Sequence, residues 1–220
     1  MTKQTKRILA SIFFLTVVIF HLYGLFYNNI MLAFYTKPFL MISLVIVYLT
    51  SIKSASFWYV SALFFSFWGD VLLLFKASLF VYGLASFLIA HIFFIKITAG
   101  FLQKFSLKQV VISSSPFVIF LFGLLYLIQD NLGEMRIPVV IYGIIISSFG
   151  AVALLNYINK KTRANRVLFL GAIIFIASDS MIAIDKFYKS QEIYSVSIMI
   201  TYILAQYLIC KAIMVKTSHQ

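Results

Sequence analysis

The sequence predicts an all-α membrane protein, a bundle of eight transmembrane helices. Hydrophobic residues make up 63% of its 220 residues and charged residues 11%. A soluble domain has about 45–50% apolar and about 25% charged residues, so this composition excludes an ordinary globular domain. Apolar stretches of about 20 residues, the length that crosses a bilayer, recur along the chain. No segment of the sequence alternates as a strand of a membrane β-barrel does.

Eight apolar stretches define the predicted helices, with polar or basic residues between them. Their ranges are 8–27, 30–50, 56–75, 78–98, 108–128, 136–156, 167–186 and 193–214. The first stretch follows the basic start MTKQTKR and is longer than the core of a signal peptide. No small-x-small cleavage pattern follows it, so we expect an uncleaved first transmembrane helix. The chain has only 3 prolines, which fits mostly uninterrupted helices.

Individual helices carry features that bear on packing or chemistry. The second contains TKPF, the third FFSFWGDVLLLF and the seventh SDSMIA, while RIPV (136–139) opens the sixth. Gly83, Ser86 and Ala90 place small residues on one side of the fourth helix, as close helix packing requires. In the fifth helix, SSSP (113–116) indicates a kink or bend rather than a catalytic serine.

The net charge of +12 comes from basic residues in the short connections between the predicted helices. That distribution indicates topology and contact with anionic membrane lipids, and it argues against nucleic acid as a partner. One predicted side carries 13 of the 18 Lys and Arg residues, namely Lys3, Lys6, Arg7, Lys53, Lys96, Lys104, Lys108, Lys160, Lys161, Arg163, Arg166, Lys211 and Lys216. The other side carries Lys76, Arg136, Lys186 and Lys189, and Lys37 lies within a helix. The positive-inside rule therefore places both termini in the cytoplasm, in a multi-pass protein of the cytoplasmic (inner) membrane.

The chain is predicted to form one polytopic domain, 1–220, with two weakly similar halves, 1–104 and 105–220. FSFWGDVLLLF in the third helix resembles FIASDSMIAID in the seventh, and FLIAHIFFIK (87–96) aligns without gaps on YILAQYLICK (202–211). Four helices per half would form a parallel repeat, whose matching helices cross the membrane in the same direction. Chance similarity is the alternative, because apolar helices resemble one another in composition.

Three ionisable residues lie inside predicted helices at one level of the membrane. Asp70 and Asp179 each lie about 20 Å from the cytoplasmic edge, and Lys37 about 18 Å, at 1.5 Å per helical residue and about 30 Å of hydrocarbon. Since buried charges need partners, we expect these side chains to converge. One lysine neutralises only one of two carboxylates, so one carboxyl is expected to hold a proton. Such a pair can act as general acid and general base; the alternative is an ion pair that only fixes the helices.

Other polar side chains could extend this group into a pocket. His91 and Gln206 are aligned in the two halves, each about 21 Å from the outer edge, and Tyr202 lies one turn from Gln206. Tyr142 in the sixth helix could donate a hydroxyl proton. For His91 a hydrogen bond between helices is an equal alternative to a site role, whereas His21 is interpreted as a packing residue. The sequence gives little support for a zinc site, because its histidines and carboxylates do not cluster at ligand spacing. No nucleophile-elbow, metalloprotease or phosphate-loop motif occurs in the sequence.

The chain resembles the YhhN-type lysoplasmalogenase family of multi-pass membrane proteins. The stretches that carry the resemblance occur in the family's order: TKPFLM (36–41), SFWGDVLLL (66–74), FLIAH (87–91), SDSMIA (178–183) with KF (186–187), and TYILAQ (201–206). The resemblance implies hydrolysis of the vinyl ether bond of a lysoplasmalogen, a lysophospholipid of the bilayer, to a fatty aldehyde and a glycerophospho-base. It also implies that Asp70 and Asp179 are catalytic.

The residues suit this chemistry without a metal or an organic cofactor. Vinyl ethers hydrolyse when an acid protonates the alkenyl carbon and water adds to the resulting cation. A protonated carboxyl and a carboxylate supply the two functions. Lys37 could stabilise the carboxylate or contact the phosphate, with Tyr142, His91, Tyr202 and Gln206 as further substrate-binding candidates.

Two other functions fit the same features. Buried Asp, Lys and His residues also form proton relays, so a proton-coupled small-molecule or lipid transporter is one alternative. A non-catalytic membrane scaffold with structural ion pairs is the other, and it predicts that apolar replacement of the whole group is tolerated. Hydrolysis by purified protein in detergent separates an enzyme from both alternatives.

Overall fold

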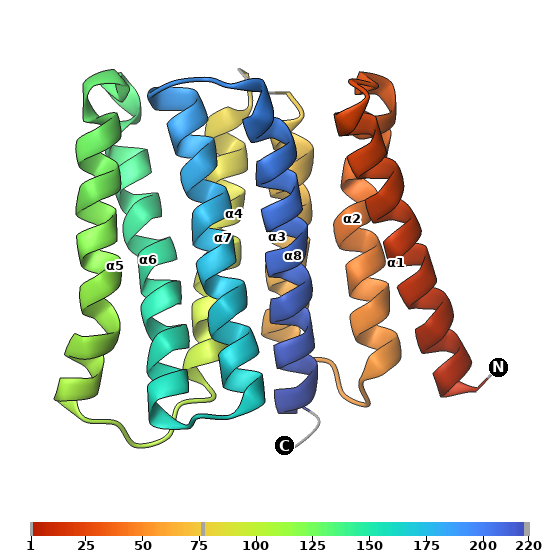
Figure 1. Ribbon diagram of the computed structural model, residues 1–220. Helices are drawn as coiled ribbons and strands as arrows, with labels where there is room; N and C mark the ends of the chain where they lie inside the picture. The colour runs from red at the N-terminus through yellow and green to blue at the C-terminus, as the bar shows by residue number, and fades with distance from the viewer. Residues whose placement is uncertain (1, 76–77, 218–220) are drawn as a thin grey trace. The chain divides into compact units, whose positions relative to one another are not determined.

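The computed structural model describes residues 2–75 and 78–217, and within them the chain is helical, with no strand. The α-helices are α1 Lys3–Phe26, α2 Ile30–Ser51, α3 Phe57–Leu73, α4 Phe80–Ala99, α5 Leu107–Ile128, α6 Arg136–Asn159, α7 Arg163–Phe187 and α8 Glu192–Thr217 (Figure 1). Two short 3₁₀ turns, η1 Gln129–Asn131 and η2 Gly133–Met135, join α5 to α6. The eight predicted helices are confirmed; Lys76 lies outside the described residues.

Seven of these helices are long and apolar enough to cross a membrane. The exception is α3, which has 17 residues and spans roughly 26 Å, short of a hydrocarbon core of about 30 Å. The third predicted span was too long because Leu74 and Phe75 are apolar but lie in a turn beyond the helix. The chain is therefore a multi-pass helical membrane protein, while the orientation of its termini stays a prediction.

Helix boundaries follow local capping chemistry. The α1 helix begins at Lys3, five residues before the predicted range 8–27, because the Thr2 side chain accepts a hydrogen bond from Thr5 N. A capping box formed by Ser106 and Gln109 fixes the start of α5. Pro38 and Pro116 lie inside α2 and α5, and both helices continue past them.

The chain divides into two compact units. The first comprises Met1–Phe93 and Ile213–Gln220, and the second comprises Phe94–Ala212. Because the division falls within α4 and α8, each of these helices contributes to both units.

In the first unit α1 and α2 form a close hairpin (Figure 1). A Cβ atom on Gly24 would lie 2.9 Å from the backbone nitrogen of Ala33, so glycine is needed where the two helices meet. Asn29 ends the turn and caps α2, since its Oδ1 accepts a 3.1 Å hydrogen bond from Leu32 N. His21 reaches across this hairpin to Thr36, with 2.9 Å between Nδ1 and Oγ1.

Small residues bring α3 and α4 together in the same unit. A Cβ atom on Gly83 would lie 2.8 Å from Leu73 Cδ2, and Ser86 Oγ donates a 2.7 Å hydrogen bond to Phe65 O. From the other side, a Cβ atom on Gly69 would lie 2.5 Å from the ring of Phe87. Two residues of the stripe that was predicted to serve packing, Gly83 and Ser86, therefore contact α3.

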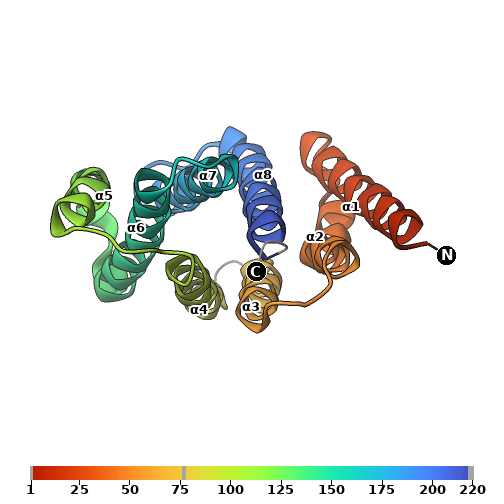
Figure 2. The same cartoon turned by 90° about the horizontal axis from the view of Figure 1, so that it is seen from below.

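The second unit is tied together by amides and aromatic rings. Asn156 Nδ2 donates to Thr98 O at 2.9 Å, and Asn165 Nδ2 donates to Asn156 O at 2.9 Å, which links α4, α6 and α7. Four rings pack in series across α6, α4, α7 and α8, with centroids 5.5, 6.1 and 5.5 Å apart: Phe149, Phe94, Phe175 and Tyr202. In Figure 2 α5, α6 and α7 follow one another side by side.

We expect Gly69→Ala to lower the free energy of unfolding by about 1–3 kcal/mol, because the new methyl group displaces the Phe87 ring. The matched control is Gly123→Ala on α5, where a Cβ atom would have no neighbour within 4 Å among the described residues. Denaturant titration of the purified protein in detergent measures both. Equal stability of Gly69→Ala and the wild type would contradict this packing.

Candidate active site

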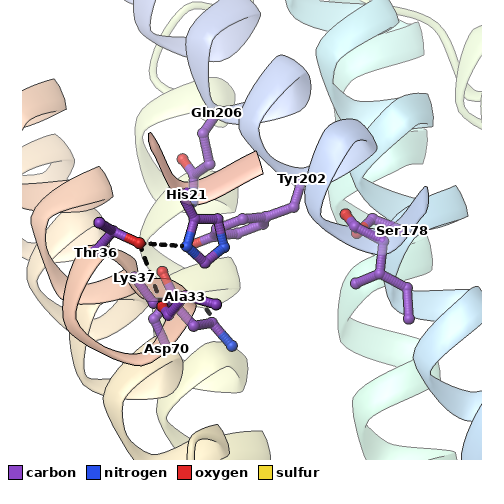
Figure 3. A network of polar contacts seen from close by, with 9 residues as sticks. His21, Ala33, Thr36, Lys37, Asp70, Ser178, Tyr202 and Gln206 are labelled. Atoms are coloured by element: carbon purple, nitrogen blue, oxygen red, sulfur yellow. Dashed lines mark hydrogen bonds and ion pairs between the residues drawn. The ribbon is translucent and has the colours of Figure 1, made fainter. Parts of the chain in front are cut away.

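The first unit contains an ion pair between two apolar helices, α2 and α3 (Figure 3). Lys37 Nζ on α2 lies 4.0 Å from Asp70 Oδ1 on α3, and their side chains are only 15% and 3% exposed. Gly69 lets α4 pack closely beside Asp70, because its missing side chain leaves space for the Phe87 ring. Asp70, the next residue, faces α2. The predicted contact between Lys37 and Asp70 is therefore present.

The second carboxylate has a phenol as its partner. The Tyr142 hydroxyl on α6 donates a hydrogen bond to Asp179 Oδ2 on α7. The serines on either side of Asp179 bond to backbone carbonyls instead. Ser178 Oγ donates to Ile198 O of α8 at 3.0 Å, and Ser180 Oγ donates to Ile176 O at 2.6 Å. In SDSMIA the serines thus bond to backbone carbonyls, while Asp179 binds the hydroxyl of Tyr142, a residue expected from the sequence only as a hydroxyl donor without a named partner.

A cavity of about 40 Å³ opens beside this pair. Its walls come from α5, α6 and α7, and its lining residues are Phe120, Leu121, Leu124, Leu125, Val139, Tyr142, Gly143, Ile146, Ser147, Asp179, Ser180 and Ala183. Most of this lining is apolar, and Asp179, Tyr142 and two serines are its polar members. The space exceeds the roughly 10–15 Å³ that one water needs, so it admits water or part of a hydrocarbon chain next to a carboxyl group.

Sequence reasoning did not find this cavity. The α5 residues on its wall form an apolar pattern that any lipid-facing helix could have. One signal was present, namely Gly143 directly after Tyr142. A Cβ atom there would lie 2.5 Å from Leu121 Cδ1, so the glycine lets the Leu121 side chain of α5 pack closely against α6.

The remaining candidate residues occupy both units. His91 is fully buried, and its Nδ1 lies 2.7 Å from Phe87 O, so this bond stays within α4 rather than joining two helices. Gln206 and Tyr202 are buried one turn apart on α8, with 3.5 Å between Nε2 and the hydroxyl oxygen (Figure 3). Since Asp70 belongs to the first unit and Asp179 to the second, their convergence stays a prediction.

Over residues 2–75 and 78–217, no group of three or more His, Cys, Asp or Glu side chains is arranged to hold a metal ion. Cys210 is a buried free thiol.

The sequence matches a known protein family and two named proteins. The sequence model of the YhhN family matches residues 32–213. The chain is 32% identical over 157 residues to proteins named lysoplasmalogenase from Mycobacterium bovis and Mycobacterium tuberculosis. The match covers 69% of this chain and 58% of each relative, so the chain spans less than two thirds of their length. No solved structure matches the chain.

We expect Lys37→Met to destabilise the protein by about 3 kcal/mol, because it leaves the Asp70 carboxylate without its cation in an apolar environment. The double variant Lys37→Met/Asp70→Leu should recover most of that loss, since no buried charge remains. Lys53→Met is the control, as Lys53 is exposed. Denaturant titration gives the three free energies, and a Lys37→Met variant as stable as the wild type would show that the pair is not coupled.

Proposed function

Because the chain belongs to the YhhN family, we propose that it is a membrane lysoplasmalogenase. It would hydrolyse the vinyl ether bond of a 1-alkenyl lysophospholipid to a fatty aldehyde and a glycerophospho-base. The name of its relatives supports this reaction. The structural observation that carries it is the Asp179 carboxyl, hydrogen-bonded by Tyr142, in the wall of a mostly apolar cavity.

The reaction needs one carboxyl that gives a proton and one that carries charge. Lys37 balances the charge of an ionised Asp70, so we assign the carboxylate role to Asp70. The Tyr142 hydroxyl bonds Oδ2 of Asp179 without supplying a positive charge, so we assign the acid role to Asp179. Such a division between two carboxyl groups is known from glycoside hydrolysis.

The proposed steps balance in protons. Asp179 protonates the alkenyl carbon distal to the ether oxygen, which produces an oxocarbenium ion. Water adds to the carbon that bears oxygen and transfers a proton to Asp70, giving a hemiacetal. Asp179 then accepts the hemiacetal hydroxyl proton, Asp70 protonates the glycerol oxygen, and that carbon–oxygen bond breaks. Both carboxyl groups return to their starting states, and the mechanism requires both to reach one substrate molecule.

The lipid would bind with its chain and its headgroup in different surroundings. The cavity between α5, α6 and α7 suits the alkenyl chain next to the reacting bond, because its lining is largely apolar. Lys37 is our candidate for contact with the phosphate, and the substrate would enter from the surrounding cytoplasmic membrane. His91, Tyr202 and Gln206 remain candidates for further substrate contacts.

We expect Asp70→Asn and Asp179→Asn each to reduce aldehyde release by at least about a hundredfold, because each removes a proton-transfer group. Purified variants in detergent are assayed for aldehyde and, separately, for fatty acid, with vinyl ether and ester lysophospholipids as substrates. Asp130→Asn is the control, since Asp130 is an exposed residue of η1. Near-normal aldehyde release by both variants, each folded by size-exclusion chromatography, would refute the assignment.

Gly143→Val should narrow the cavity against Leu121 and lower kcat/KM for long alkenyl chains by about tenfold or more, with a smaller loss for short chains. Gly123→Val is the matched control, because a side chain there meets open space. Hydrolysis of substrates that differ only in chain length measures the effect. Parallel chain-length profiles for the two variants would place the chain elsewhere.

A further inference from the structure

The α1 helix contributes a polar side chain to the neighbourhood of Lys37. The family match begins at residue 32, so α1, Lys3–Phe26, lies outside it. Even so, His21 of α1 contacts Thr36, the residue directly before Lys37 (Figure 3). The close approach at Gly24 holds α1 against α2 at this point, which fixes where the imidazole lies.

The contacts of Thr36 determine which nitrogen of His21 carries hydrogen. The Thr36 hydroxyl lies 2.6 Å from Leu32 O and 3.4 Å from Ala33 O, so its single hydrogen is directed to the backbone of α2. Its oxygen therefore accepts the bond from His21 Nδ1, which must carry a hydrogen. In a neutral imidazole the other nitrogen, Nε2, is then an acceptor.

That acceptor is buried and is not satisfied within the described part of the chain. His21 is 1% exposed, and Nε2 has no hydrogen-bond partner among residues 2–75 and 78–217. An unsatisfied buried acceptor costs about 1–3 kcal/mol. A hydroxyl donor supplied by a ligand would satisfy this acceptor.

We propose that His21 Nε2 accepts a hydrogen bond from the free hydroxyl group of the lysophospholipid glycerol. This inference rests on the proposed function and extends it to substrate selection. The ligand would carry a hydroxyl donor close to an anionic group. His21 of α1 supplies the acceptor, and Lys37 of α2, which follows the Thr36 that His21 contacts, supplies the cation. A 1-alkenyl lysophospholipid carries its free hydroxyl on the glycerol carbon next to the one that bears the phosphoester.

The proposal explains how a lyso lipid is distinguished from a two-chain lipid. Acylation of the glycerol hydroxyl replaces the donor with an ester, which has only acceptors. His21 Nε2 would then face an acceptor and lose its hydrogen bond. A site that hydrogen-bonds a substrate hydroxyl discriminates strongly against analogues without that hydroxyl. An apolar pocket discriminates between such analogues much less.

The test compares two substrates across three amide and aromatic variants. The substrates are 1-alkenyl-2-hydroxy-glycerophosphoethanolamine and its 2-deoxy analogue. The wild type should prefer the hydroxyl substrate by about tenfold in kcat/KM. His21→Asn keeps a donor near the Nδ1 position but has no acceptor at Nε2, so its preference should fall to near one. His21→Gln places an amide oxygen near Nε2 and should retain most of the preference, while His21→Phe should lose it.

Four outcomes decide the proposal. Loss of preference in His21→Asn together with retention in His21→Gln supports it. Equal rates of the wild type on both substrates, an undiminished preference in His21→Asn, or equal loss in His21→Asn and His21→Gln would each overturn it. Denaturant titration of each variant checks that the protein is folded.

Binding separates this inference from the proposed function. If the wild type releases no aldehyde from either substrate, the proposed hydrolysis is wrong. Calorimetric binding of a saturated 1-O-alkyl-2-hydroxy-glycerophosphoethanolamine and its 2-deoxy analogue then decides the role of His21. A preference of about tenfold that disappears in His21→Asn supports recognition of the hydroxyl, and equal affinity for both lipids rejects it.

Discussion

A polar side chain inside a membrane-spanning helix must meet a polar partner, because hydrocarbon supplies none. In the described part of this chain, some of these partners are side chains of neighbouring helices. His21 bonds Thr36 between α1 and α2, Lys37 pairs with Asp70 between α2 and α3, and Tyr142 bonds Asp179 between α6 and α7. Apolar packing alone would leave the rotation of these helices loosely defined. The polar contacts fix it, and they place both carboxylates at defined helix surfaces.

Glycine makes room beside these contacts. In α3, Gly69 faces Phe87 of α4, and the next residue, Asp70, faces Lys37 of α2. In α6, Tyr142 faces Asp179 of α7, and Gly143 faces Leu121 of α5. Consecutive helical residues point about 100° apart, so a glycine next to a polar residue lets one helix serve two neighbours. The same arrangement occurs independently in each compact unit.

The sequence revealed those features that depend on length, charge or burial cost. Apolar length located every helix, and burial cost predicted Lys37 as a partner of the aspartates. Tyr142 was expected only as a hydroxyl donor, and its bond to Asp179 comes from the structure. It did not show that α3 stops at Leu73, because hydropathy continues through the following turn. The hydrogen bond of His91 to its own helix and the cavity beside Asp179 depend on side-chain packing, which has no simple sequence signature. His21 was interpreted as packing alone, because the tautomer that leaves Nε2 an acceptor follows from Thr36 geometry. Convergence of Asp70 with Asp179 stays a prediction.

The cavity is the feature that a purely structural role explains least. A scaffold needs Asp179 to be bonded, and Tyr142 already achieves that. The cavity of about 40 Å³ beside the carboxyl contributes nothing to that bond. A larger residue in place of Gly143 would displace Leu121, which lines the same cavity. Under the proposed function this space has a use, because the alkenyl chain would lie in it next to Asp179, whereas a purely structural contact has none.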